Sequence, residues 1–566
     1  MSIRTNRFKA VDRVLKDLER VEKEGKLNDL KSELNKIKEV FLKVKENEEE
    51  LLDTLAVVDG YIRNKNIAKL REEEGHFCQK IWNSTLKLLP AAHHAQAAAS
   101  SHHHVTPLPS STTPQLQEED LEMIKVNYNN LGNIQKRTFS SLLQLPENAV
   151  FKRRELIFWY ASSAIYFWYP GEVVIDSLLR SKLIVSHGNG KSPIASKFKI
   201  NPLLRHKSLS PLFQNQEVPI CGYYSQIKTS SSSPASDIGY ESLVLDQRKI
   251  KISDGFGFKS NHCYYIYNVG ASYLNFGPGW MAKMKDLRRL QLGRFMQDSP
   301  KHHIEVDSEE FLKELRGHEN LRYLSLRGIS RIFELPPSIV KINSLRILDL
   351  KACHNLETVP SDISSLRWLW YLNLSECYLL DRMPKGIENL TWLEVLKGFV
   401  LGSSSKTPCR ISDIAANLKI LKRLSIRIGS GAVIQDGEFE SLEELSKLEH
   451  LKISWGVFDT RYIDIQISVP SSLKKLHLEG FPGQNIPEWL KPSKLPYRLT
   501  ELHITGGKLK SLDHGENNDW KMEMVYLKYL KDLDVDLEHL RKLFPSLRYV
   551  EIKQILNQPY LEWSIN

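Results

Sequence analysis

One short stretch of the sequence has the residue types that bind phosphate in many proteins. Residues 188–192, Gly-Asn-Gly-Lys-Ser, match the last five letters of the phosphate-binding loop Gly-x-x-x-x-Gly-Lys-Ser. Such a loop works only when a helix follows it, because the N–H groups at the helix N-terminus face the phosphate. Here Val185 stands at the first glycine position and Pro193 follows the serine. The sequence therefore lacks the geometry for phosphate binding.

The residues around this stretch predict a hairpin instead. Two β-type runs, 183–186 and 197–200, flank a connection rich in Gly, Asn and Ser. Four helical segments precede them, and in the last of these we expect Val173, Val174, Leu178 and Leu179 on the buried face. Helices followed by a hairpin are typical of an α+β winged-helix domain. We assign this domain to residues 120–205, with residues 187–196 at the tip of the wing.

The cysteines predict no metal or redox chemistry. The six of them form no CxxC pair, and their spacings fit no zinc site. Reduced thiols are the expectation for a cytosolic protein. Cys353 and Cys377 follow the last leucine of two repeats described below, where a small polar residue satisfies backbone groups. We expect a structural role for both.

The acidic residues near the C-terminus resemble a calcium loop only superficially. Asp532, Asp534 and Asp536 alternate, but Leu537 and Leu543 stand where such a loop needs Gly and Glu. We interpret the three aspartates as an acidic end of the repeat surface. No Ser/His/Asp arrangement or carboxylate pair is recognisable elsewhere, so we expect no enzyme, no catalytic residue, no metal site and no cofactor.

Length and composition indicate a multidomain cytoplasmic protein. The 566 residues allow three or four domains of about 150 residues each. The N-terminus has no apolar segment typical of a signal peptide. The most apolar run, Ile157–Tyr169, is 13 residues long and too short to span a bilayer. We expect no transmembrane segment, and peripheral association with the plasma membrane stays an alternative.

The first 119 residues predict a helical domain and a linker. Within residues 1–89, which we assign to this domain, apolar residues from Leu27 to Ile62 recur at alternating spacings of three and four, as in a coiled coil. Such helices either form a solitary bundle or mediate self-association and partner docking. Residues 90–119 are rich in Ala, Ser, His and Pro and read as a low-complexity linker.

The C-terminal half of the chain repeats itself. The pattern L-x-x-L-x-L appears at Leu287 and again at Leu321, Leu345 and Leu369, 24 residues apart, with looser copies from Leu393 to Leu547. This self-similarity predicts an α/β leucine-rich-repeat solenoid over residues 281–566. The segments "LPPSI", "VPSDI" and "MPKGI" are expected on its convex return. Residues 206–280 read as a transitional segment with β-strands.

Side chains between the leucines must point to the concave face of this solenoid. They form a mixed aromatic and charged strip that suits a protein partner. The alternative is a merely solvated face. The predicted partner-binding residues are Tyr323, Ser325, Arg327, Ile347, Asp349, Lys351, Tyr371, Asn373, Ser375, His450, Lys452, Lys475, His477, Glu479, Glu501 and His503.

Residues 126–165 resemble the winged-helix region of plant coiled-coil nucleotide-binding leucine-rich-repeat (NLR) disease resistance proteins. The N-terminal helices and the repeats stand where that family has them. The resemblance implies ADP/ATP binding by a domain between the helices and the winged helix, but here only the linker lies there. The family's nucleotide-sensing Met-His-Asp is replaced by Ile200-Asn201-Pro202. The positions that agree are Tyr128, Leu131, Lys136, Phe139, Leu142, Pro146, Glu147, 152–156 and Trp159.

The resemblance therefore implies an intracellular protein of plant defense that lacks a functional nucleotide switch. Its repeats would bind a pathogen effector or a host protein, and its N-terminal helices would self-associate or contact an intact NLR. One alternative is a scaffold or adaptor outside immunity, such as a substrate-recognition subunit. Another is nucleic-acid binding through Lys152, Arg153 and Arg154, which the resemblance explains as structural residues.

Overall fold

The computed structural model places most of the chain after residue 113. The chain divides into two compact units, Met1–Ser111 with Asp298–Pro300, and Thr112–Gln297 with Lys301–Asn566. Apart from Val58, Glu73 and Phe77, the predicted coiled coil lies outside the described residues, as does most of the linker. The structure describes Val58, Glu73, Phe77, 114–143, 149–153, 155–158, 171–187, 197–204, 221–223, 242–253, 263–293, 303–403, 409–456, 460–515, 519–556 and 558–564.

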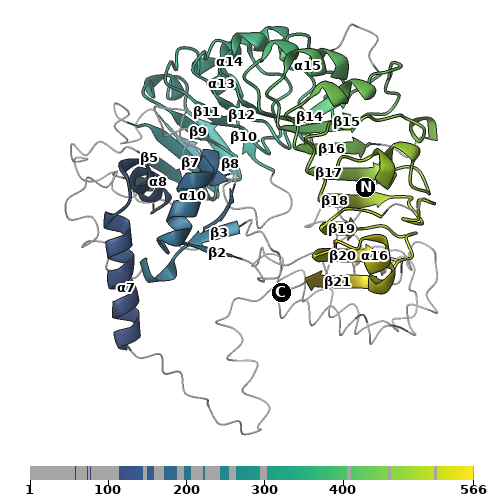
Figure 1. The fold of residues 1–566 in the computed structure, drawn as a ribbon. Helices are drawn as coiled ribbons and strands as arrows, with labels where there is room; N and C mark the ends of the chain where they lie inside the picture. Colours follow the sequence, from purple (N-terminus) through teal and green to yellow (C-terminus); the bar gives the residue numbers. More distant parts are fainter. Residues whose placement is uncertain are drawn as a thin grey trace, which may run out of the picture. The chain divides into compact units, whose positions relative to one another are not determined.

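Helices and a small sheet form the first part of the second unit, in blue in Figure 1. Strand β3 pairs antiparallel with both β1 and β2, which confirms the predicted hairpin. Its connection, 188–196, lies outside the described residues, and the winged-helix assignment stays a prediction. The elements are α7 (Pro114–Asn129), α8 (Asn133–Leu143), β1 (Val150–Lys152), α10 (Gly171–Arg180), β2 (Ile184–Ser186), β3 (Lys197–Ile200) and η4 (Pro202–Leu204).

Aromatic and aliphatic side chains from these elements share one core. Tyr128 and Phe139 pack with ring centroids 6.1 Å apart, and both are buried. On α10 the buried residues are Val174, Ile175 and Leu178. Val173 is 39% exposed, so its predicted place on the buried face was wrong. The buried face of α10 therefore includes Ile175 instead of Val173.

A long sheet forms the rest of this unit, and Figure 1 shows its later strands stacked in chain order. In the described residues it has 15 strands, and it begins at β4, ahead of residue 281. The strands are β4 (Cys221–Tyr223), β5 (Ser242–Leu245), β7 (Tyr265–Asn268), β9 (Arg289–Gln291), β11 (Tyr323–Ser325), β12 (Ile347–Asp349), β13 (Tyr371–Asn373), β14 (Val395–Leu401), β15 (Arg423–Ile428), β16 (His450–Trp455), β17 (Lys475–Phe481), β18 (Glu501–Gly507), β19 (Met524–Lys528), β20 (Tyr549–Ile555) and β21 (Gln558–Ser564).

All strand pairs of the long sheet are parallel except the last, where β21 folds back on β20. Three more strands, β6 (Lys249–Ile252), β8 (Tyr273–Phe276) and β10 (Glu305–Val306), form a separate parallel sheet. Short helices make the returns: η6 (Met281–Lys283), α13 (Glu310–Glu314), α14 (Pro337–Val340), η7 (Ser361–Ser365), η8 (Ile387–Asn389), α15 (Ile411–Asn417), η9 (Glu440–Glu444), η10 (Thr460–Tyr462), η11 (Glu488–Leu490), η12 (Pro492–Lys494) and α16 (Leu537–Leu543).

The leucines of the repeat pattern form the solenoid core. Leu324, Leu348 and Leu372 occupy equivalent positions on paired strands, and each is fully buried. The three predicted convex segments lead into the short helices α14, η7 and η8 and overlap their first residues. Stacking the repeats buries one continuous core that a single repeat could not form. The structure confirms the predicted repeat solenoid.

Two buried thiols at the turns connect neighbouring repeats. The Cys353 thiol donates to the Leu326 carbonyl at 3.1 Å, and the Cys377 thiol donates to the Leu350 carbonyl at 3.2 Å. Burial raises the pKa of both thiols, that of Cys377 to about 12. These bonds confirm the structural role expected for the two cysteines, since each ties a repeat to the preceding one.

The aspartates near the C-terminus have a different role from the predicted one. Residues 530–536 contain a turn at 531–532 and no strand, and Asp536 is the N-cap of the helix α16. Its carboxylate accepts the backbone N–H of His539 at 2.7 Å. An aspartate at this position satisfies one of the open N–H groups of the first turn. Asp536 is therefore a helix cap.

Candidate protein-binding surface

The concave face is defined here as the sheet face opposite the leucine core. Its side chains come from alternate positions of β11 to β20, because successive residues of a strand point to opposite faces. Parallel pairing in a constant register aligns these positions in columns across the strands. The structure therefore brings the predicted residues onto one face, but it gives the two halves of that face different surroundings.

The N-terminal half of the face, on β11 to β14, is covered by an aromatic side chain. Phe158 forms one cluster with Tyr323, Ile347, Tyr371 and Val395 from four neighbouring strands, and all five side chains are buried. The Phe158 ring centroid lies 4.5 Å from that of Tyr371 and 6.2 Å from that of Tyr323. Residues predicted to meet a partner are here in contact with another part of the same chain.

The polar positions of this half are also occupied. The Asn373 amide donates to Asp349 Oδ1 at 2.9 Å and to the Tyr371 hydroxyl at 3.2 Å. Ser325, Asp349 and Asn373 are buried, whereas Arg327, Lys351 and Ser375 are half-buried. Six of the nine predicted positions in this half are thus enclosed. Their role as a partner surface stays a prediction.

The C-terminal half of the face, on β15 to β20, is more open. All seven predicted residues here are half-buried, and strand pairing brings them side by side. They are His450, Lys452, Lys475, His477, Glu479, Glu501 and His503. The same columns continue through six residues that the sequence prediction did not include, namely Arg423, Arg427, Tyr526, Lys528, Tyr549 and Glu551. Two of these residues, Tyr526 and Lys528, lie on β19. The alternation of Val525 and Leu527 in the sequence could have identified them as outward positions.

A row of rings runs along the middle of the C-terminal half. His503 and Tyr526 stack with centroids 3.9 Å apart and planes 16° from parallel. His477 lies 5.4 Å from His503, and Tyr549 lies 5.4 Å from Tyr526. Side chains stand roughly perpendicular to a sheet. Rings that stack from strand to strand therefore turn their edges outward.

Ion pairs connect neighbouring strands on both sides of this row. Lys452 lies 2.7 Å from Glu479, Lys475 lies 2.5 Å from Glu501, and Lys528 lies 2.8 Å from Glu551. Hydrogen bonds from His503 and Lys475 outweigh burial and lower the pKa of Glu501 to about 2. All three carboxylates are therefore already engaged by cations of the same face.

The histidines of this face are neutral near pH 7. Burial, followed by nearby cations, lowers the pKa of His450 to about 4 and that of His477 to about 3. Burial also lowers the pKa of His503. No cluster of metal-ligating side chains occurs among the described residues.

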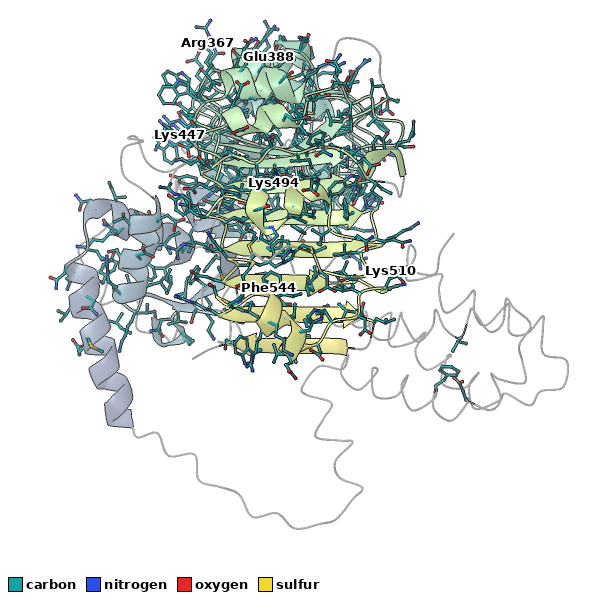
Figure 2. The ribbon with its side chains drawn as sticks, turned by 45° about the vertical axis from the view of Figure 1, so that its right-hand side comes forward. Arg367, Glu388, Lys447, Lys494, Lys510 and Phe544 are labelled. Carbon is teal, nitrogen blue, oxygen red and sulfur yellow. The ribbon has the colours of Figure 1, made fainter. Side chains whose placement is uncertain are left out.

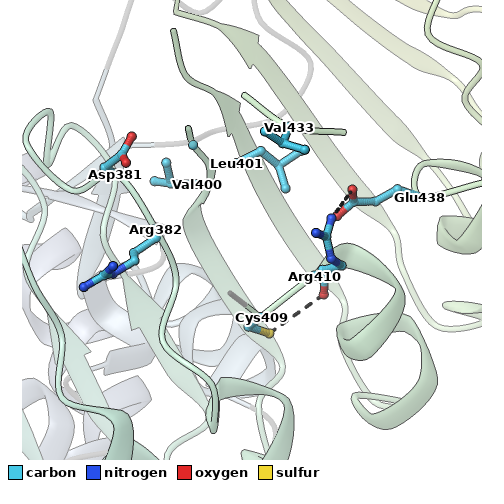
Figure 3. A pocket seen from close by; sticks show the side chains of 9 residues that line it. Asp381, Arg382, Val400, Leu401, Cys409, Arg410, Val433 and Glu438 are labelled. Carbon is cyan, nitrogen blue, oxygen red and sulfur yellow. Dashed lines mark hydrogen bonds and ion pairs between the residues drawn. The ribbon is translucent and has the colours of Figure 1, made fainter. Parts of the chain in front are cut away.

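Two cavities lie outside the columns of this open face. One of about 10 Å³ lies beside Glu438, and Figure 3 shows Arg410 pointing toward that carboxylate. Glu438 is 2% exposed and also accepts the backbone N–H groups of Ile411 and Gln435. Such a space holds about one water molecule. A second cavity, of about 420 Å³, lies between residues 463–466 and 481–489.

The residues in place of the nucleotide-sensing motif have structural contacts. Ile200 ends β3 and is buried, and the Asn201 amide donates to the Lys182 carbonyl at 2.8 Å. Pro202 begins the 3-10 helix η4. Arg153, from the basic run, pairs with Glu172 and Asp176 on α10. Asn201 and Arg153 therefore connect their own segments to neighbouring elements of the fold.

Comparison with known proteins gives two matches. Residues 281–513 match the family described as "Leucine-rich repeat region". The chain is also 35% identical over 166 residues to Disease resistance RPP13-like protein 4 from Arabidopsis thaliana. That alignment covers 28% of this chain and 19% of the relative, so it spans only a small share of the relative's length. The chain therefore contains a leucine-rich-repeat region, and over part of its length it is similar to a plant protein named as a disease resistance protein.

Proposed function

We propose that this chain is an intracellular plant disease-resistance-like protein that binds a pathogen effector or a host protein through its repeats. The observation that carries this proposal is the open C-terminal half of the concave face. Charged and aromatic side chains stand in register across six strands there, and a solenoid offers them as a preformed surface. The relative named as a disease resistance protein supports the biological context.

The proposal assigns the chain no enzymatic step and no nucleotide switch. The Gly-Lys-Ser stretch lacks the first glycine of a phosphate loop, and Ile200-Asn201-Pro202 stands where the family senses the nucleotide. The region 120–205 would be a winged-helix domain, and the N-terminal helices would mediate self-association or contact an intact NLR. No described helix is both long and apolar enough to cross a bilayer.

Capture of partners from plant tissue tests this function. Tagged full-length protein is expressed in leaves, and co-purified proteins are compared with those recovered by a variant in which Lys475 and Tyr526 are both changed to Ala. We expect the unchanged protein to recover effector or NLR-class proteins, and we expect the variant not to recover them. Recovery of ubiquitin-ligase subunits instead would favour an adaptor function. Stoichiometric ATP binding by the purified protein would contradict the missing nucleotide switch.

A further inference from the structure

The larger of the two cavities lies between the loops of two consecutive repeats. One wall is the segment 463–466, which follows the short helix η10, and the other is the segment 481–489, which begins at the last residue of β17. Its volume is about 420 Å³. Sites for small molecules usually have about 300–1,000 Å³. The cavity is therefore large enough for a small organic ligand.

Apolar side chains from both walls line this cavity. Phe481, Ile486 and Trp489 are buried and belong to the solenoid core. Ile463 and Ile465, from the opposite wall, are half-buried. Because burial removes apolar surface from water, such a lining favours a ligand with an apolar body.

Contacts with the rest of the solenoid hold the second wall in place. The Phe481 carbonyl accepts the backbone N–H of Lys508 at 3.0 Å, and the Gln484 carbonyl accepts that of Lys510 at 2.8 Å. Figure 2 shows Lys510 at the margin of the repeats. A Cβ added to Gly483 would lie 2.6 Å from the Phe481 ring, so the glycine lets the loop lie close to that ring. A wall that is already ordered lowers the entropic cost of binding.

The backbone of both walls offers hydrogen-bond donors. Within the part of the chain that the structure describes, the N–H groups of residues 463–466 and 483–486 donate to no backbone carbonyl. All eight residues line the cavity. Gly483 and Ile486 are buried, and a buried backbone N–H that lacks an acceptor costs free energy. A ligand that carries oxygen acceptors would satisfy such groups.

The charges around the cavity favour an uncharged ligand. Its charged lining residues are the carboxylates Asp464 and Glu488 and the ammonium Lys508. Glu488 also lies 2.6 Å from Lys491, whereas Asp464 is exposed beside the N–H groups of its own wall. An anion at these N–H groups would be repelled by Asp464, and a cation would be repelled by the N–H groups themselves. A neutral carbonyl oxygen accepts the same hydrogen bonds without either cost.

We propose that this cavity binds an uncharged amphipathic small molecule, with an apolar body against Phe481, Ile486 and Trp489 and with carbonyl oxygens at the N–H groups of the walls. A small molecule fits better than an extended segment of a partner protein. Residues 463 and 464 form a bend, whereas an added strand pairs along an extended edge. The site lies outside the concave columns, so this proposal does not rest on the proposed function.

The binding experiment uses the full chain and the probe phenylpropanamide, which has an aromatic body and a neutral carbonyl group. Ligand-observed saturation-transfer NMR gives its dissociation constant. Phenylpropanoate and phenylpropylammonium share the ring and the chain but carry a negative and a positive charge, so they are matched controls. We expect the amide to bind about tenfold more tightly than either charged compound.

Two variants locate the site. Ile463→Asp places a charge on the apolar wall and is expected to weaken binding of the amide about tenfold. Its control is Leu379→Asp, at a side chain that is 51% exposed and does not line the cavity. Asn485→Trp places a large ring at an exposed lining position and should also weaken binding, whereas Asn343→Trp, at an exposed position of another repeat, should not. Thermal melts show that each variant remains folded.

Three results would overturn the proposal. Phenylpropanoate could bind as tightly as the amide, or the cavity variants could weaken binding no more than their controls. A capped pentapeptide with one central phenylalanine among threonines could bind more than tenfold more tightly than the amide, which would make the cavity a site for a polypeptide. The proposed function is judged separately, because capture from plant tissue depends on Lys475 and Tyr526 and not on Ile463 or Asn485.

Discussion

The two halves of the concave face are built on the same repeat and differ in what covers them. On β11 to β14 the outward residues Tyr323, Ile347, Tyr371 and Val395 form a buried cluster with Phe158. On β15 to β20 most of the outward residues are charged or aromatic and half-buried, whereas Arg423 is exposed and Tyr549 is buried. The leucine core is equally buried below both halves. The fold therefore requires only the inward positions, and the outward ones are available for contacts that differ along the solenoid.

The junction between the halves is a β-bulge on β14. The pairing of β14 with β15 shifts between Lys397 and Phe399, and Gly398 lies between them with φ of +76°. A Cβ added to Gly398 would lie 2.3 Å from the Leu374 carbonyl carbon and 2.4 Å from the Ser375 nitrogen. Only glycine fits this backbone, because any side chain meets the preceding strand.

Gly398→Ala should therefore have the largest effect. We expect a loss of about 4 kcal/mol in the free energy of unfolding, since the clash involves backbone and the left-handed conformation adds strain. Urea denaturation followed by circular dichroism measures it. Gly437 has the same φ of +76°, but nothing lies within 4 Å of an added Cβ. Gly437→Ala should cost about 1 kcal/mol, and equal losses in the two variants would show that the junction is not special.

Removing the Phe158 side chain should expose the N-terminal half of the concave face and make its exposure similar to that of the C-terminal half. Phe158→Ala deletes a ring that packs against Tyr371, Tyr323 and Trp370. We expect a loss of about 3 kcal/mol from this contact, as for other buried aromatic truncations. Hydrogen exchange of the backbone amides on β11 to β13 should become faster, because these strands lose their cover.

The control for this variant is Phe333→Ala. Phe333 is 49% exposed, so its truncation should cost less than about 0.5 kcal/mol. If exchange on β11 to β13 stays the same in Phe158→Ala, the cover does not protect this half in solution. The difference between the two halves would then reside in their side chains alone.

The sequence predicted the core better than the surface, for a physical reason. Leucines at 24-residue intervals report the inward positions directly, because every repeat must fill the same space. The early strands β5 and β7 were not recognised as repeats, because "SLVL" and "YIYN" replace the leucine pattern. The sheet consequently begins well before the predicted boundary at residue 281.

Phe158 shows what a repeat pattern cannot reveal. Its contacts with Tyr323 and Tyr371 join segments far apart in the sequence, and no local signal marks them. Asp536 shows a second limit, because alternation suggested a strand where the chain makes a turn and a helix cap. The predicted residues on β16 to β18 needed only strand alternation, so their common face followed from the sequence.

Acid should affect the histidine-bearing strands β16 to β18. The pKa of His450 is about 4 and that of His477 about 3 in the folded chain, below the 6.5 of an exposed histidine. The unfolded chain then binds more protons between these values, so stability falls as the pH drops from about 6.5 toward 4 and is unaffected above that range. Both side chains are partly solvated, so we expect only about 1 kcal/mol from each.

Hydrogen exchange at pH 7.5 and 5 measures this effect on strands β16 to β18. The double variant with Gln in place of His450 and His477 cannot take up these protons, so its stability should change less over the same range. Glu501 acts in a lower window, because its pKa of about 2 gives stability that is lost only as the pH falls from about 4.5. A loss of stability that is already present between pH 8 and 7 would contradict the assignment of the acid effect to His450 and His477.

The smallest expected effect concerns the ion pairs of the C-terminal half. Lys452 and Glu479 lie 2.7 Å apart, with side chains 34% and 44% exposed. A double-mutant cycle with Lys452→Ala and Glu479→Ala should give a coupling of at most about 0.5 kcal/mol, as for other solvated pairs. Charges that add so little to folding are available for recognition. A coupling above about 1.5 kcal/mol would mean that the columns serve stability instead, and the contrast between a closed, structural half and an open, binding half would lose its basis.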